Sequence, residues 1–141
     1  MLRAYRTMLT PPFGPVYVCF DAEHQEAALG ESIDIPDIRR FSPPTPLSAD
    51  PGVLDKVASL LVAAEHPVIL ADQVGRFPVA WQALVKLATD LGIAVLDCGG
   101  TVGFPSTHPM DLTGCEQEIL GEADVLVAVE VTDLLGAVCI S

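Results

Sequence analysis

Three acidic residues follow three apolar, strand-like segments of the sequence. Asp72 ends the first apolar run, Asp97 ends the second, and Glu130 comes directly after the third. The carboxyl ends of parallel strands meet at one edge of a sheet, and small ligands bind at that edge in α/β proteins. We therefore expect these carboxylates either to contact a ribose or line a cleft, or to cap the turns after their strands.

Four residues in the loops beyond these strands are candidate nucleotide contacts: Gly75, Arg76, Gly100 and His108. The guanidinium of Arg76 suits a phosphate or a carboxylate, and a surface ion pair is the alternative. Gly100 lies in the glycine-rich stretch 99–103, which follows a strand but lacks the full G-x-G-x-x-G pattern and opens no helix directly. A loop that uses glycine for tight turns is the other interpretation of this stretch.

His108 lies between Ser106 and Asp111, which invites comparison with a catalytic triad. Members of a triad come together in the fold rather than in the sequence, and no G-x-S-x-G nucleophile elbow is present. The expected role of His108 is that of a hydrogen-bonded loop histidine.

The elements that must position these residues alternate between helix and strand. Asp50 is a favourable N-cap with Pro51 at the first helical position, and Gly92 supplies a helix stop. Apolar runs without alternation are typical of strands buried on both faces. The pattern predicts an α/β fold, a parallel sheet with flanking helices. Its expected order is helix 50–65, strand 68–72, helix 78–91, strand 94–97, helix 116–122 and strand 125–129.

The first fifty residues have a different character. Residues 2–9 have helical spacing, and 16–20 read as a short strand, Val-Tyr-Val-Cys-Phe. Because a lone strand is not stable, it must join the later sheet or belong to a domain that is mostly missing. Residues 25–49 are polar and proline-rich and are predicted to be an interdomain linker. We thus divide the chain into 1–24, 25–49 and 50–141, with a boundary near Ser48.

A mostly apolar run, 134–140, closes the sequence, and we expect both ends to be cut from a longer chain. Nineteen acidic against seven basic residues give a net charge of -12, which disfavours nucleic acid as a partner. No apolar run reaches the roughly 18 residues of a membrane span, and no targeting segment is recognised. A cytoplasmic protein is the expectation.

Four cysteines are present, at positions 19, 98, 115 and 139, without C-x-x-C spacing. This arrangement disfavours a zinc site or a disulfide framework. Cys19 and Cys98 fall in or beside apolar runs, so reduced, buried thiols are expected there.

Five short motifs follow one another in order along residues 50–127. They are Asp50-Pro51, His66-Pro-Val-Ile-Leu-Ala-Asp72, Leu84-Val-Lys-Leu-Ala88, Phe104-Pro-Ser-Thr-His-Pro109 and Ala123-Asp-Val-Leu-Val127. Together they resemble the Rossmann-like central domain of thiamine diphosphate-dependent enzymes, the family of acetolactate synthase, pyruvate decarboxylase and benzoylformate decarboxylase. The segment from Thr10 to Asp21 resembles the closing strand of that family's pyrimidine-binding domain.

The resemblance implies a fragment of a larger enzyme that acts on 2-oxo acids, with thiamine diphosphate and Mg²⁺ bound by the full-length protein. Partners would be other domains of the same chain and further copies in a homodimer or homotetramer. In the family, the glutamate that activates the aminopyrimidine lies well upstream of these residues, and a Gly-Asp-Gly motif with a downstream asparagine holds magnesium and diphosphate in the third domain. This sequence contains no Gly-Asp-Gly, so no catalytic or metal-binding residue is assigned. FAD or an adenine nucleotide binds the central domain in some members, but the turn at 73–76 has less glycine than theirs.

Three hypotheses follow. The chain is a scaffold part of such an enzyme, inactive alone; or it is a free-standing nucleotide- or flavin-binding module; or it is a non-catalytic structural or oligomerisation domain that associates through residues 134–140.

Overall fold

In its computed structural model, the chain forms two compact units, Met1–Ser48 and Ala49–Ser141. The structure describes residues 1–28, 30, 32, 34–45, 47–99 and 102–138. Within these ranges, no helix has the length and apolar character needed to span a membrane. The assignment of the segments 1–24 and 25–49 to a particular domain and linker stays a prediction.

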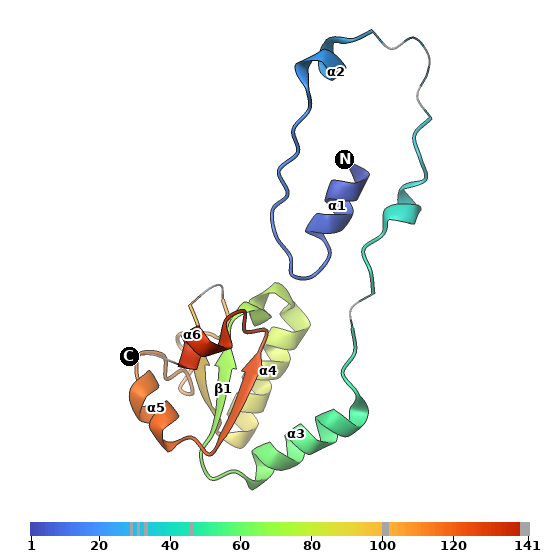
Figure 1. Cartoon of the computed structure of the whole chain (residues 1–141). Coiled ribbons are helices and arrows are strands. Elements are labelled where there is room, and N and C mark those ends of the chain that lie inside the picture. The colour runs from blue at the N-terminus through green and yellow to red at the C-terminus, as the bar shows by residue number, and fades with distance from the viewer. Residues whose placement is uncertain (29, 31, 33, 46, 100–101, 139–141) are drawn as a thin grey trace. The chain divides into compact units, whose positions relative to one another are not determined.

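The described part of the first unit contains three short helices: α1 (Leu2–Met8), α2 (Ala22–Glu26) and the 3-10 helix η1 (Ile38–Phe41). The predicted helix near the N-terminus is thus confirmed. The prediction of a strand at 16–20 is wrong. These residues form an irregular, extended segment between α1 and α2 (Figure 1). The physical reason is that the described residues of this unit offer no second strand with which it could pair.

The second unit begins with α3 (Pro51–Ala63), whose start is fixed by the predicted cap. The Asp50 carboxylate accepts hydrogen bonds from the backbone N–H groups of Gly52 at 2.8 Å and Val53 at 3.3 Å. The next long helix, α4 (Pro78–Leu91), ends at Gly92, which adopts the left-handed conformation with φ of 66°. A side chain would strain the backbone there, so glycine terminates the helix.

Three strands form a parallel sheet in the order β2-β1-β3. They are β1 (Pro67–Ala71), β2 (Ala94–Asp97) and β3 (Val125–Val129), and Ile69 lies opposite Val95 and Val127. The described residues of the unit also form two shorter helices, α5 (Glu116–Glu122) and α6 (Leu134–Val138). The predicted α/β fold is confirmed, and α6 accounts for residues 134–138 of the final apolar run, whose last two residues lie outside the described part.

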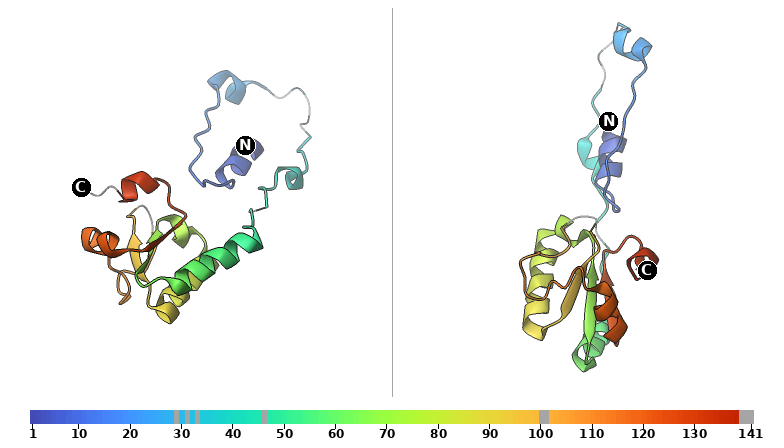
Figure 2. Two further views of the ribbon diagram at one scale, coloured as in Figure 1. Left: turned by 60° about the horizontal axis from the view of Figure 1, so that its bottom comes forward. Right: turned by 90° about the vertical axis from the view of Figure 1, so that its left-hand side faces the viewer.

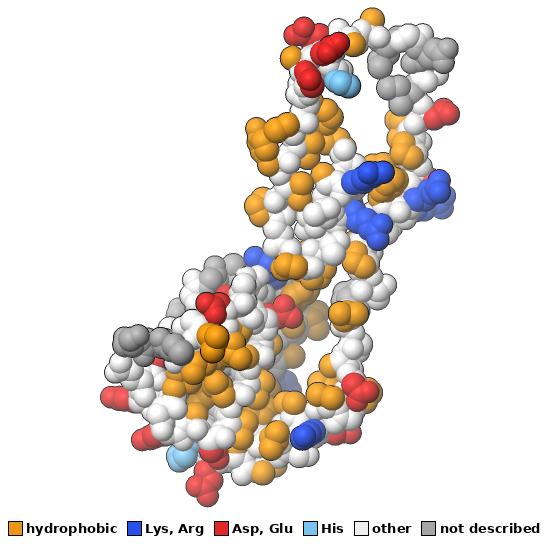
Figure 3. Space-filling view, viewed as in Figure 1, with side chains coloured by type: hydrophobic (Ala, Val, Ile, Leu, Met, Phe, Trp, Pro, Cys, Tyr) orange, Lys and Arg blue, Asp and Glu red, His pale blue; other side chains and the backbone are white. Residues whose placement is uncertain are grey.

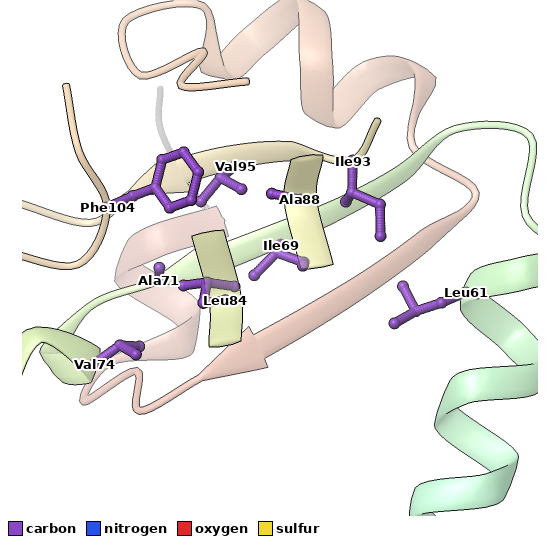
Figure 4. Close-up of a cluster of buried hydrophobic side chains, with 9 residues drawn as sticks. All are labelled: Leu61, Ile69, Ala71, Val74, Leu84, Ala88, Ile93, Val95 and Phe104. Atoms are coloured by element: carbon purple, nitrogen blue, oxygen red, sulfur yellow. The ribbon is translucent and has the colours of Figure 1, made fainter. Parts of the chain in front are cut away.

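Helices cover both faces of the sheet (Figure 2). On one face, Ile69 and Ala71 of β1 pack with Leu84 and Ala88 of α4, and Leu61 of α3 joins this cluster (Figure 4). On the other face, the β1 side chains Val68 and Leu70 contact residues of α5 and α6. The four β1 residues 68–71 are at most 2% exposed, so this strand is the centre of the core.

The cysteines differ from expectation. Cys19, Cys98 and Cys115 are free thiols, and all three are exposed, so the expected burial of Cys19 and Cys98 is wrong. Cys19 belongs to the segment 16–20, which is not part of the sheet. Cys98 lies one residue beyond the end of β2, where the sheet is no longer covered by neighbouring residues. Cys139 lies outside the described residues.

Asp124 fastens the start of β3 to the turn between α3 and β1. Its carboxylate accepts the backbone N–H of Glu65 at 2.7 Å and that of His66 at 3.0 Å. These hydrogen bonds favour the ionised form, and the one from Glu65 is the largest cause that lowers the pKa of Asp124 below its ordinary value of 3.8.

Stability should therefore depend on pH through Asp124. Because the folded-state pKa is the lower one, the stabilisation is complete above pH 3.8 and is lost as the pH falls through the folded-state pKa. Urea unfolding at several pH values should show a smaller acid-dependent loss in Asp124→Asn than in the unmodified chain. Glu122→Gln, on the neighbouring α5, is the control and should keep the original pH profile; identical profiles for all three proteins would refute the assignment.

Candidate functional site

A cavity of about 300 Å³ lies at the carboxyl ends of β1 and β2, on the face covered by α5 and α6. Its walls include the apolar side chains of Leu70 and Leu96, and the carboxylates of Asp72, Glu116 and Asp133 stand around it. None of its described lining residues is Lys or Arg. The site is therefore placed where α/β proteins bind ligands, but its charge is negative.

Asp72 links the loops that follow β1 and β3. Its side chain accepts hydrogen bonds from the backbone N–H of Thr132 at 3.2 Å and from the Thr132 hydroxyl at 3.1 Å. The Thr132 hydroxyl in turn accepts one from the Gln73 amide at 2.8 Å. In the strand order β2-β1-β3, the loops after β1 and β3 leave the sheet on opposite sides of a switch point. Ligands of open α/β sheets bind in the crevice at such a point, and the contacts of Asp72 join the two loops there.

Asp97 organises the glycine-rich loop after β2. One carboxylate oxygen accepts the N–H of Gly99 at 2.9 Å, and the other accepts those of Gly103 at 3.0 Å and Phe104 at 3.1 Å. The strand-end acids were expected either to contact a ligand or to cap the turns after their strands, and Asp72 and Asp97 both accept hydrogen bonds from such turns. Glu130 has a positive φ of 53°, and its backbone carbonyl accepts the N–H of Gln73.

Two glycines allow the loops after β1 and β2 to touch. A Cβ added at Gly75 would clash with the Val102 carbonyl, and one added at Gly103 would lie 2.7 Å from the Ala71 carbonyl oxygen. Backbone from the protein itself thus occupies the space beside these glycines. The close packing of the two loops thus accounts for glycine at position 75, because any side chain there would clash with the neighbouring backbone.

His108 joins its loop to α4. Its Nδ1 accepts the backbone N–H of Met110 at 3.1 Å, and its Nε2 lies 3.0 Å from the Thr89 hydroxyl, which donates to the Val85 carbonyl. This arrangement places the ring proton on Nε2. The ring also stacks edge-on against Phe104, with centroids 5.0 Å apart. His108 is a hydrogen-bonded loop histidine, as expected. The Asp111 backbone N–H donates to the His108 carbonyl, whereas the Asp111 carboxylate accepts from Thr113 and does not form a triad with the ring.

Of the four candidate nucleotide contacts, the three that the structure describes are not among the residues that line the cavity. Gly75 packs on Val102, His108 bonds to Thr89, and Arg76 is exposed at the end of η2 (Gln73–Arg76). Gly100 lies outside the described residues. Their role in nucleotide binding stays a prediction.

Cys98 contributes a thiol to the lining of the cavity. Partial burial, followed by the nearby charges of Asp72 and Asp97, raises the pKa of the thiol above its ordinary value of 9.0. A raised pKa reduces the fraction of thiolate at neutral pH, so this cysteine lacks the activation of a catalytic nucleophile.

Thr132 and Thr89 were missed by the sequence interpretation. Thr132 comes three residues after the end of β3 and bonds to a side chain 60 residues away. Only the position of Thr132 just beyond a predicted strand could have indicated this role. No signal in the sequence pairs Thr89 with His108, because an exposed helical threonine has no distinctive pattern.

Comparison with known proteins gives three distant relatives. The chain is 34% identical over 89 residues to a 2-hydroxyacyl-CoA lyase of Oryza sativa subsp. japonica, an alignment that covers 62% of the chain. It is 30% identical over 130 residues, 92% of its length, to a probable acetolactate synthase of Mycobacterium bovis and to the acetolactate synthase large subunit IlvG of Mycobacterium tuberculosis. The chain is distantly related to these enzymes.

The chain spans only 15% of the length of the lyase and 23% of that of the two synthases. No family model matches the sequence, and no solved structure matches it. The relationship therefore covers a part of each enzyme.

The hydrogen bond between His108 and Thr89 should contribute to stability. His108→Ala removes it together with the bond from Met110, and should lower the free energy of unfolding by about 1–3 kcal/mol. Chemical denaturation of His108→Ala, Thr89→Val and the double variant measures the coupling between the two side chains. Thr107→Ala, at the exposed neighbour, is the control; strictly additive losses would show that the pair does not interact.

Proposed function

We propose that the chain is part of a thiamine diphosphate-dependent enzyme that acts on 2-oxo acids in the manner of acetolactate synthase, forming or cleaving a carbon–carbon bond. The similarity to two proteins named acetolactate synthase, over 92% of the chain, supports this proposal most strongly. The parallel α/β sheet agrees with the Rossmann-like central domain that the sequence motifs resemble.

Within that enzyme, the second unit would serve as a scaffold. The strand-end carboxylates Asp72 and Asp97 are engaged in fastening loops. No three His, Cys, Asp or Glu side chains among the described residues are placed to hold a metal ion, and the sequence contains no Gly-Asp-Gly. The residues of this chain thus do not fit thiamine diphosphate with Mg²⁺, whose thiazolium acts as an electron sink when bound, and other parts of the enzyme would hold both.

The proposal extends to partners and place. The scaffold would contact other domains of the enzyme and further copies in a homodimer or homotetramer, in the cytoplasm. Its contribution to catalysis would then be the relative position of domains that carry the coenzyme.

A chimera tests this role. Residues 50–138 should replace the aligned segment of the Mycobacterium tuberculosis acetolactate synthase large subunit IlvG and retain formation of acetolactate from pyruvate, because the scaffold supplies shape and no reacting group. The readouts are acetolactate yield, thiamine diphosphate affinity and oligomer mass. A second chimera with Asp124→Ala, which breaks the anchor of β3, is the matched control and should lose activity. A chimera that folds and assembles but forms no acetolactate would contradict the proposal.

A free-standing nucleotide- or flavin-binding module is the second candidate, favoured by the cavity at the carboxyl end of the sheet. The carboxylates of Asp72, Glu116 and Asp133 oppose it, because they repel the phosphates of FAD and of adenine nucleotides.

Calorimetry of the purified 141-residue chain distinguishes the two candidates. The scaffold role predicts no binding of FAD or ADP at micromolar concentration, owing to the negative lining of the cavity and the packed loops beside Gly75. Arg76→Ala is the matched variant. Micromolar binding that this substitution weakens would establish the module instead.

A further inference from the structure

The glycine-rich stretch 99–103 is a feature of the sequence that the proposed function does not use. It follows the carboxyl end of β2, the place at which loops of parallel α/β sheets bind the phosphate groups of ligands. Such loops hold an anion with backbone N–H groups that point to one spot. Gly99 and residues 102–104 belong to the described part of this loop, and three of them donate hydrogen bonds to the same side chain.

That side chain is the carboxylate of Asp97, the last residue of β2. Gly99 donates its N–H to one carboxylate oxygen at 2.9 Å, and Gly103 and Phe104 donate theirs to the other at 3.0 Å and 3.1 Å. A local turn explains the bond to Gly99, which lies two residues beyond Asp97. It does not explain the bonds to Gly103 and Phe104, which lie six and seven residues beyond it. The two ends of the loop thus converge on one anion.

The N–H groups that hold this anion are shielded from solvent and fixed in place. Phe104 is 3% exposed, Gly103 is buried, and a Cβ added at Gly103 would lie 2.7 Å from the Ala71 carbonyl oxygen. The Asp97 backbone N–H donates to the Thr113 hydroxyl at 2.9 Å, which fixes the start of the loop. Because a buried N–H group without an acceptor is costly, these donors need an anion or another acceptor whenever the chain is folded.

We propose that these three N–H groups form a phosphate-binding site that the chain itself keeps closed, with the Asp97 carboxylate as a tethered anion in place of a ligand's phosphate. A carboxylate and a phosphate both present oxygen acceptors to backbone N–H groups. Because Asp97 is covalently attached to the loop, its carboxylate competes with a free ligand at a high effective concentration. An external phosphate therefore binds only when this carboxylate is removed. The contact is autoinhibitory, and it does not depend on the enzyme to which the chain belongs.

The charge of the second unit favours an internal anion over an external one. Residues 49–141 hold 13 of the 19 acidic residues and three of the seven basic ones. Figure 3 shows Asp and Glu side chains spread over this unit. Such a surface repels a free phosphate before it reaches the loop, whereas a carboxylate that is part of the chain needs no approach from solvent. Salt screens the repulsion between exposed charges, so the site is best tested at high ionic strength.

Rescue of a truncated side chain by free anions tests the proposal. Asp97→Ala removes the carboxylate and leaves a space of its size beside the three N–H groups. The urea midpoint of this variant should fall in sodium chloride. In sodium formate or sodium phosphate, at the same pH and ionic strength, most of the loss should be recovered with a saturable dependence on anion concentration. The unmodified chain reports the general effect of each salt on stability, and only the excess in the variant counts.

Amide resonances locate the bound anion. In nitrogen–proton correlation spectra of Asp97→Ala, phosphate should shift the amide signals of Gly99, Gly103 and Phe104 more than those of other residues, because these N–H groups donate to it. Shifts centred on another part of the chain would overturn the proposal.

Two further variants serve as controls. Asp97→Asn removes the charge but fills the same space, so neither anion should restore its stability. Asp133→Ala loses the acceptor of a single N–H, that of Gly136, and should also gain nothing from either anion. If Asp97→Ala is unfolded in chloride, folding in formate and in phosphate supports the proposal equally. Equal salt effects in Asp97→Ala and the unmodified chain, folding in none of the salts, or rescue by formate without rescue by phosphate would each refute it.

Discussion

Burial of β1 on both faces and both edges is the constraint on which the second unit depends. Residues 68–71 are at most 2% exposed and pair with β2 on one side and β3 on the other. Alternate side chains of one short strand thereby enter both hydrophobic clusters. Because a buried strand in a parallel sheet needs helices on each face, the position of α4 and that of α5 and α6 follow from it.

The same constraint explains what the strand-end carboxylates do. Loops that leave a buried parallel sheet carry backbone N–H groups that need acceptors, and Asp72, Asp97 and Asp124 supply them. Asp72 and Asp97 lie at the carboxyl ends of their strands, where a ligand would bind in related folds, yet each is engaged by the protein. A scaffold role for the unit agrees with this use of its acids.

Two segments of the chain have strand-like backbone without a full set of partner strands among the described residues. The outer edge of β3 and the stretch 16–20 both expose strand-like backbone, one in each compact unit. Distant relatives are about four or more times as long as the chain, and further sequence in those proteins accompanies the aligned region.

The sequence by itself determined the α/β class, the order of the main helices and strands in residues 50–129, and the caps at Asp50 and Gly92. These features depend on local periodicity, capping chemistry and glycine conformation, which act within a few residues. The sequence interpretation failed at residues 16–20, since strand formation requires a partner, and at Cys98, whose exposure depends on where the covered part of β2 ends. Only the tertiary structure decided that Asp72 binds Thr132, that Gly75 packs on Val102 and that His108 bonds to Thr89, because each contact joins segments brought together by the packed sheet.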